Sequence, residues 1–324
     1  MKLPELRLMI LLALLGSLSP PFQGNVLSIF PVYPALAQTL ESRKAEADQL
    51  FNQGINKFRV NQFQEALESW QKALTIYREI GDRQGEAYSL NGLTNVYRAL
   101  DDYQKAIENL QQSLTMARKI GDRKGEAGSL NDIGNAYRAL GDYQKAIDFI
   151  QQSLVLKREI GDRTGEANSV NNLGIAYGSV GDYQKAIEHF HEGLAIAREK
   201  RDRFIEGSSL GNLGMVYYLM GDYSKAIDFH QQSLAIARAI GNRSSQAKSL
   251  NNLGNAYNSQ GDYQKAIDFY QQSLAIARAI GDRQGEAKFL NNIGNAYRSL
   301  GDYSKANDFH QHSLAIKREI GLQR

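Results

Sequence analysis

The sequence predicts an all-α protein, an α-solenoid of seven helix-turn-helix units that together form a superhelix. Two repeated motifs carry this prediction. An Ile-Gly-Asp-Arg motif and its variants return every 40 residues from Ile80 to Ile280, and a Gly-Asp-Tyr motif returns with the same spacing from Gly141 to Gly301. Between these motifs, apolar residues recur every three or four positions, which is the period of one helix face. No segment alternates as a half-buried strand would, so strands are not expected.

The first 37 residues differ from the rest of the chain, because they contain all five prolines. Lys2 and Arg7 precede an apolar run at residues 8–18. This run is too short for a bilayer core, which needs ~20 residues, but it fits the core of a signal peptide. We predict a signal peptide at residues 1–37, cleaved between Ala37 and Gln38, and a secreted or periplasmic protein. The long segment between the apolar run and the cut leaves an uncleaved anchor as the alternative.

The predicted solenoid occupies residues 38–324. Its units one to seven are residues 41–80, 81–120, 121–160, 161–200, 201–240, 241–280 and 281–320. In unit six the first helix has its apolar face at Leu250, Leu253, Gly254 and Tyr257, and the second at Tyr263, Ala266, Ile267, Tyr270 and Leu274. Gly261 and Asp262 between them are typical of a helix end and of a helix N-cap.

Glycine interrupts the first helix of five units, at Gly134, Gly174, Gly214, Gly254 and Gly294. Each glycine costs ~0.5–1 kcal/mol relative to alanine inside a helix. Such a cost is tolerable where a side chain would collide with a packed neighbour. We therefore predict that glycine faces alanine, as in Gly254 and Ala266, at a close contact between the two helices of a unit.

The pattern Leu250-x-x-Leu253-Gly254-x-x-Tyr257, followed by Ala266-x-x-x-Tyr270, resembles the tetratricopeptide repeat (TPR). The resemblance covers residues 41–320. The common period of that family is 34 residues and its repeats end in proline, whereas this chain has a period of 40 and Gly-Asp turns. The longer period is similar to the repeats of kinesin light chains, of animal spindle-orientation adaptors and of secreted bacterial TPR arrays.

In TPR arrays the first helices line a concave groove, so the resemblance implies that their polar stripe lines a groove here. Of 30 stripe positions in units two to seven, none is acidic and five are basic. Asparagine can donate to and accept from a peptide backbone, and arginine can bind carboxylate or phosphate. The predicted peptide-binding residues are Asn91, Asn95, Arg98, Asn131, Asn135, Arg138, Asn171, Ile175, Met215, Tyr218, Lys248, Asn251, Asn255, Lys288, Asn291, Asn295 and Arg298.

Three features of the stripe have a second interpretation. The asparagines could instead bridge adjacent repeats and hold the superhelix. The apolar residues Ile175, Met215, Tyr218 and Leu219 could anchor a partner or reflect drift in less constrained repeats. Unit one carries three apolar residues at Phe51, Ile55 and Phe58. They either form an apolar edge of the groove or indicate that this unit is shifted by one residue in register.

The sequence carries no catalytic signature. The absence of cysteine excludes disulfides, thiolate metal sites and cysteine catalysis. The phosphate-loop, H-E-x-x-H and G-x-S-x-G motifs are also missing. His230 and His310 take the place of Trp70, Phe190 and Tyr270, so they are interpreted as packing residues. We expect a non-catalytic protein with no cofactor and no metal.

A formal charge of +3 gives no strong attraction to nucleic acid or to anionic membrane. We expect a module that binds an extended, acidic or phosphorylated peptide segment. The alternative is a cell-envelope scaffold that self-associates through its ends or its convex face. Asn307 replaces the isoleucine of earlier units and makes the last helix more polar, which favours a self-capped end. Leu314, Ile316 and Ile320 could instead stay partly exposed and dimerise.

Overall fold

A computed structural model of the protein describes residues 32–321, with side chains from Thr39 onward. In this range the chain forms only helices and turns. The helices are α2 (Val32–Arg59), α3 (Phe63–Ile80), α4 (Arg83–Ala99), α5 (Tyr103–Ile120), α6 (Arg123–Ala139), α7 (Tyr143–Glu159), α8 (Arg163–Val180), α9 (Tyr183–Lys200), α10 (Arg203–Leu219), α11 (Tyr223–Ala239), α12 (Arg243–Ser259), α13 (Tyr263–Ile280), α14 (Arg283–Ser299) and α15 (Tyr303–Glu319).

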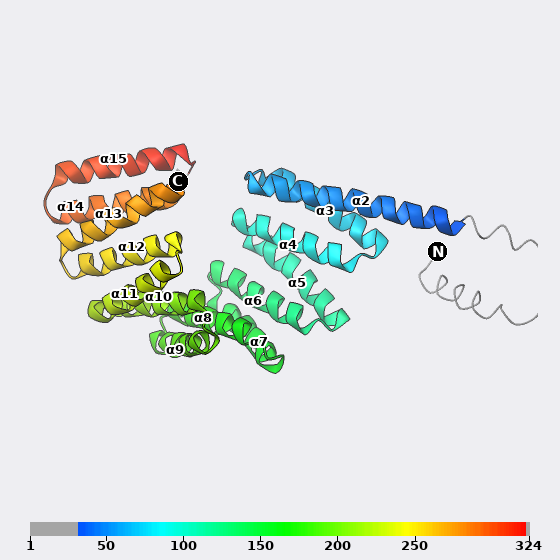
Figure 1. Ribbon diagram of the computed structural model, residues 1–324, viewed down its shortest axis with the longest axis horizontal. Coiled ribbons are helices and arrows are strands. Elements are labelled where there is room, and N and C mark those ends of the chain that lie inside the picture. The colour runs from blue at the N-terminus through cyan, green and yellow to red at the C-terminus, as the bar shows by residue number, and fades with distance from the viewer. Residues whose placement is uncertain (1–31, 322–324) are drawn as a thin grey trace, which may run out of the picture.

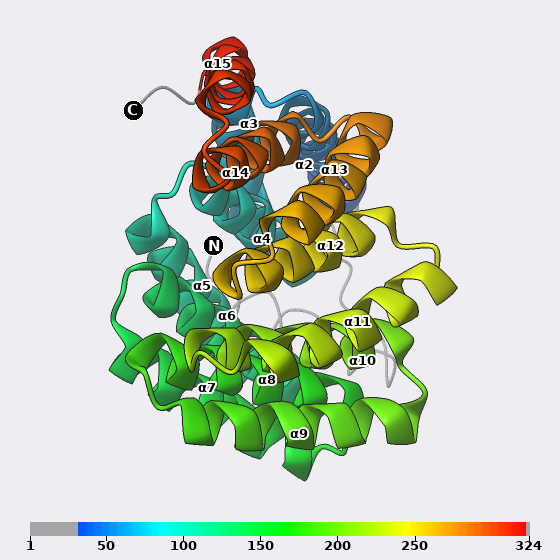
Figure 2. The same ribbon diagram turned by 90° about the vertical axis from the view of Figure 1, so that its left-hand side faces the viewer.

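The helices pack as seven antiparallel pairs, beginning with α2 and α3 and ending with α14 and α15. The pairs follow an arc whose two ends are visible at the top of Figure 1, with α7 to α10 at the bend. First helices of neighbouring units contact one another, as α8 does with α10 and α10 with α12, more than second helices do. The first helices therefore lie on the inner side of the arc, and Figure 2 shows α9 and α15 on its outside. The predicted all-α solenoid of seven units is confirmed.

The repeated Gly-Asp pair ends one helix and begins the next. Gly81 has a φ of 73°, a left-handed conformation that glycine adopts without strain. The carboxylate of Asp82 then accepts hydrogen bonds from the N–H groups of Gln84 (3.1 Å) and Gly85 (3.0 Å) at the start of α4. Unit five begins instead with Arg201, whose φ of 56° places a side chain in the left-handed region.

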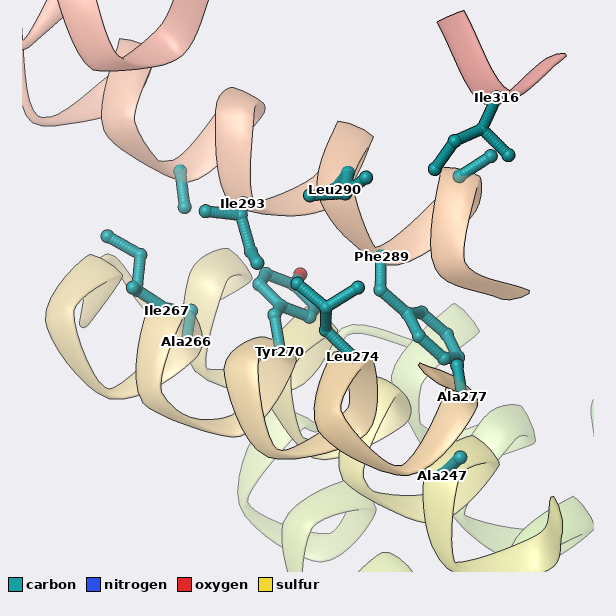
Figure 3. Close-up of a cluster of buried hydrophobic side chains, with 12 residues drawn as sticks. Ala247, Ala266, Ile267, Tyr270, Leu274, Ala277, Phe289, Leu290, Ile293 and Ile316 are labelled. Carbon is teal, nitrogen blue, oxygen red and sulfur yellow. The ribbon is translucent and has the colours of Figure 1, made fainter. Parts of the chain in front are cut away.

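The core lies between the helices of each unit and between neighbouring units. Figure 3 shows Tyr270 and Leu274 of α13 pointing toward Leu290 and Ile293 of α14, and all four are buried. The mid-helix glycines make room for a ring: a Cβ on Gly254 would lie 2.5 Å from Tyr270, and one on Gly214 would lie 2.6 Å from His230. The close approach within a unit was predicted, but its named partner was wrong. Glycine faces the residue four positions after the alanine, because that side chain is long enough to reach across.

Unit one keeps the register of the others. Gly54 faces Trp70 as Gly254 faces Tyr270, so the predicted alternative of a one-residue shift is wrong. The rings of Phe51 and Phe58 lie 6.3 Å and 5.9 Å from the ring of Trp70. Both are partly buried against the core of this unit. They stand at stripe positions that asparagine and arginine occupy in unit two.

At the C-terminal end, Asn307 is exposed as predicted, and Leu314 is 45% exposed. Ile316 is buried at 7% exposure, so the alternative that it stays partly exposed is wrong for this residue, whereas Ile320 is half-buried. Ile316 is buried because α15 turns this residue onto the Phe289–Leu290 core of α14.

The predicted signal peptide lies mostly outside the described residues. Helix α2 begins at Val32 and continues beyond Gln38. No helix between residues 32 and 321 is both long and apolar enough to cross a bilayer.

Candidate peptide-binding groove

The predicted stripe divides into residues that bridge repeats and residues that stay accessible. Asn171 and Asn251 are buried at 7% and 1% exposure. The Oδ1 atom of Asn251 accepts a hydrogen bond from Asn292 of the next unit (2.8 Å), and that of Asn171 accepts one from Ser209 (3.0 Å). Asn131 is bridged in the same way by Asn172 (3.0 Å). For these three positions the bridging interpretation is confirmed, and their side-chain oxygens are already engaged within the solenoid.

Two asparagines of the same row are more open, since Asn91 is exposed and Asn291 is half-buried. The row one helical turn further along is also accessible: Asn95 is exposed, and Asn135, Asn255 and Asn295 are half-buried. Of these four, Asn255 accepts a hydrogen bond from the Tyr270 hydroxyl (2.8 Å). The amides that can meet a peptide backbone are therefore fewer than the sequence predicted, because one helix face both packs on the neighbouring repeat and lines the concave side.

Arg98 and Arg138 lie together in a hollow on the concave side of units one to four. We call it the arginine hollow. Its lining residues are Phe58, Asn95, Arg98, Ala99, Tyr103, Asn135, Ala136, Arg138, Ala139 and Asn172. No carboxylate is among them. The Nε atom of Arg138 is buried without a hydrogen-bond partner in the described structure. An anion entering the hollow would find guanidinium groups that no protein carboxylate already holds.

The arginines of the inter-repeat turns are in a different state. Glu166 is almost fully buried and accepts hydrogen bonds from Arg158 (2.9 Å) and Arg163 (2.6 Å). Burial acts to raise the pKa of Glu166, but the two arginines outweigh it and hold the pKa below its ordinary value. The same arrangement recurs at Glu86 and Glu286. These arginines are structural, which leaves Arg98 and Arg138 as the available pair.

Three predicted cations lie nearer the C-terminal end, and two of them line a hollow that also contains a carboxylate. Lys248 and Lys288 line a hollow with Asn251 and Asp282. Asp132 lines a second hollow beside Asn91, and burial raises the pKa of its carboxyl group. Carboxylates therefore also line the concave side next to the acid-free stripe, because the helix cap Asp282 and the position after Asn131 reach that side. Arg298 is exposed in unit seven, far along the chain from the arginine hollow.

The apolar residues in the middle of the stripe do not form one patch. Ile175 packs against the core around Phe190. The Tyr218 ring lies 5.6 Å from that of Tyr223, and its hydroxyl accepts a hydrogen bond from Ser259 (3.1 Å). Met215 is half-buried, and Leu219 is 51% exposed. These contacts favour packing for Ile175 and Tyr218.

The structure adds two polar lining residues of the arginine hollow that the sequence did not indicate, Tyr103 and Asn172. Phe58, a predicted candidate for an apolar edge of the groove, also lines this hollow. Tyr103 is the first residue of α5 and directly follows the N-cap Asp102. Its position at the turn between α4 and α5 is the sequence feature that could have indicated it. Among residues 39–321, no group of three histidine or acidic side chains is arranged to hold a metal ion. His230 is buried against Gly214, as its interpretation as a packing residue requires.

Comparison with known proteins agrees with this architecture. The family model described as tetratricopeptide repeat matches residues 36–119, 125–199, 170–239, 205–279 and 245–319. No curated protein matches the sequence.

Among solved structures, aspartyl phosphate phosphatase F from Bacillus subtilis aligns with a TM-score of 0.70 at 16% identity, covering 97% of this chain and 81% of that one. The Rap conjugation gene regulator of plasmid pLS20, in complex with the Phr* peptide, gives 0.59 at 17% identity, covering 84% and 73%. A Podosopora anserina protein with nearly identical kinesin-light-chain TPR-like repeats gives 0.51 at 22%, covering 60% and 96%. These identities support a shared fold.

Proposed function

Since the chain belongs to the tetratricopeptide repeat family, whose domains typically mediate protein or peptide binding, we propose that its concave surface binds an extended acidic or phosphorylated peptide. The proposed role is non-catalytic. One observation carries the proposal: Arg98 and Arg138 share a hollow that contains no carboxylate, while the turn arginines are paired with glutamates. A structural neighbour whose title names a bound peptide adds support from the fold alone.

The chemistry of the arginine hollow suits one acidic side chain and the backbone beside it. Arginine presents several N–H donors in a planar fork that matches the two oxygens of a carboxylate or phosphate. Asn95 and Asn135 in the same hollow offer an amide donor and acceptor to the peptide backbone. Phe58 and the alanines at positions 99 and 139 supply apolar surface for the adjoining side chain.

Selection from a random peptide library tests this function. We expect the selected peptides to be rich in aspartate, glutamate or phosphorylated residues and to bind less tightly as salt concentration rises. The double variant Arg98→Glu with Arg138→Glu should weaken binding at least about tenfold, which corresponds to ~1.4 kcal/mol. The control with both Lys317→Glu and Arg318→Glu, on the outer helix α15, makes the same charge change outside the hollow and should bind as wild type does. Binding that depends neither on salt concentration nor on the Arg98→Glu and Arg138→Glu substitutions would refute the proposal.

We further propose export from the cytoplasm. Its support is the sequence of the N-terminal segment. N-terminal sequencing of protein made in a secreting host should then begin at Gln38. An intact N-terminus on membrane-associated protein would instead favour an anchor.

The scaffold alternative has its own support in the partly exposed Leu314 on the last helix. It predicts concentration-dependent self-association that Leu314→Lys abolishes. Light scattering distinguishes the two, since a peptide-binding monomer keeps a constant mass over the same concentrations.

A further inference from the structure

A small cavity lies between α10, α11 and α12, where units five and six meet. Its volume is about 80 Å³. That is room for a few water molecules at ~30 Å³ each, and far less than the ~300–1,000 Å³ of pockets for larger ligands. A single short side chain fits this space, whereas a cofactor does not.

The missing side chain of Gly211 accounts for the cavity, whereas a Cβ on Gly207 would already lie 3.0 Å from Ile236. Gly207 and Gly211 of α10 line the cavity, and the equivalent residues of unit six are Ala247 and Asn251. Asn251 fills its place with an amide that accepts a hydrogen bond from Asn292 of the next unit. In unit five the corresponding partner is Asn252, but Gly211 has no side chain to meet it. The cavity is therefore the space of a missing primary amide.

The buried groups around this space are neutral and form hydrogen bonds, and the exposed cations Arg203 and Lys248 also line it. Ser233 and Ser249 lie on its floor with their Oγ atoms 3.2 Å apart, and Ser233 also donates to the carbonyl oxygen of Gly207 (2.8 Å). Asn252 is buried at 7% exposure. Because Ser233 gives its hydrogen to Gly207, Ser249 donates to Ser233, so the Ser249 oxygen can accept from a ligand while the Asn252 amide can donate and accept.

An exposed aromatic ring marks the opening. Phe204 is 59% exposed and lines the cavity. The other six units carry polar residues at this position: Lys44, Gln84, Lys124, Thr164, Ser244 and Gln284. Ser208 and Lys248, which belong to the predicted concave stripe, also line the cavity and are exposed, so it opens toward that surface.

We propose that this cavity binds the primary amide side chain of an asparagine or glutamine on the bound peptide, in the place of the missing repeat asparagine. The amide oxygen accepts from the NH2 group of Asn252, its own NH2 group donates to the hydroxyl oxygen of Ser249, and Phe204 covers the aliphatic stem. An apolar side chain would leave the Asn252 amide without a partner, and a carboxylate has no hydrogen to donate to the Ser249 oxygen. The inference rests on the proposed function, because it requires a peptide on the concave surface.

Titration of the full chain with three blocked tripeptides tests the proposal. The probes are acetyl-Gly-Asn-Gly-amide and its Asp and Leu counterparts, and the readout is the backbone NMR signals of Gly207 and Gly211. The asparagine probe should shift these signals saturably, with a dissociation constant at least about fivefold lower than either counterpart. Absence of a shift, or equal binding of the Asp or Leu probe, would overturn the proposal.

The variant Gly211→Asn supplies the missing amide from the chain itself. It should weaken asparagine-probe binding at least about tenfold and raise the melting temperature, because the new side chain can bond Asn252 as Asn251 bonds Asn292. The control Gly128→Ala adds a Cβ that meets no atom within 4 Å, and it should keep wild-type probe binding. Unchanged binding by Gly211→Asn would contradict the proposed cavity.

The two proposals can fail separately. Arg98→Glu with Arg138→Glu should leave tripeptide binding unchanged, since neither arginine lines the cavity. If library peptides bind through the arginine hollow while the tripeptides do not bind, only the cavity proposal is lost.

Discussion

Units five and six have the same helices and turns but differ in what their side chains fill. Unit six carries Gly241 at its first turn and Asn251 at its bridge to unit seven, while unit five carries Arg201 and Gly211. The first helices have the same length and the second helices differ by one residue. The backbone of a repeat is thus held by contacts that all units share. Where one side chain differs in size from its equivalent in other units, the result is backbone strain, as at Arg201, or a cavity, as at Gly211. These non-equivalent side chains give each unit its own surface chemistry.

The largest expected effect comes from replacing a mid-helix glycine that packs against an aromatic ring. Gly254→Leu places a Cβ 2.5 Å from the Tyr270 ring, so we expect a loss of about 3 kcal/mol in the free energy of unfolding. Urea titration followed by circular dichroism measures it. The matched control is Gly128→Leu in α6, where the Cβ would enter open space. If the two variants were equally stable, the packing of the Tyr270 ring would not require a glycine at position 254.

The second effect separates His230 of unit five from Tyr270 of unit six. Burial, with a smaller effect of Lys248, lowers the pKa of His230 to about 4. Since the unfolded histidine titrates near 6.5, its neutral form stabilises the fold fully above that pH, and stability is lost as pH falls toward 4. Between pH 7.5 and pH 5 this amounts to about 2 kcal/mol.

The variant His230→Phe copies Phe190, which faces Gly174 in unit four. Between pH 7.5 and pH 5, the free energy of unfolding of this variant should fall by about 2 kcal/mol less than that of wild type. Urea titration of both proteins at the two pH values measures the difference. A pH dependence identical to that of wild type would assign the effect to other groups.

The smallest effect concerns the turn that opens unit five. Arg201→Gly should raise the free energy of unfolding by about 1 kcal/mol, because glycine accepts the φ of 56° without strain. The reverse change, Gly241→Arg in unit six, should lower it by a similar amount. Thermal unfolding of both variants checks this symmetry. A destabilised Arg201→Gly would show instead that the arginine side chain makes a contact that outweighs its backbone strain.

The sequence by itself determined the solenoid, its seven units, the turns and the inward position of the mid-helix glycines. These follow from periodicity and from backbone preferences, which act over a few residues. It also identified Arg98 and Arg138 as candidates, because their helical spacing sets them on one stripe.

Only the tertiary structure decided which side chains of that stripe are available. Asn95 and Asn251 have the same chemistry, yet Asn95 is exposed and Asn251 bonds the next repeat. Whether a polar group is free depends on residues 40 positions away and on the curvature that brings them near. The cavity beside Gly211 has the same origin, since a missing side chain becomes a space only when three helices enclose it.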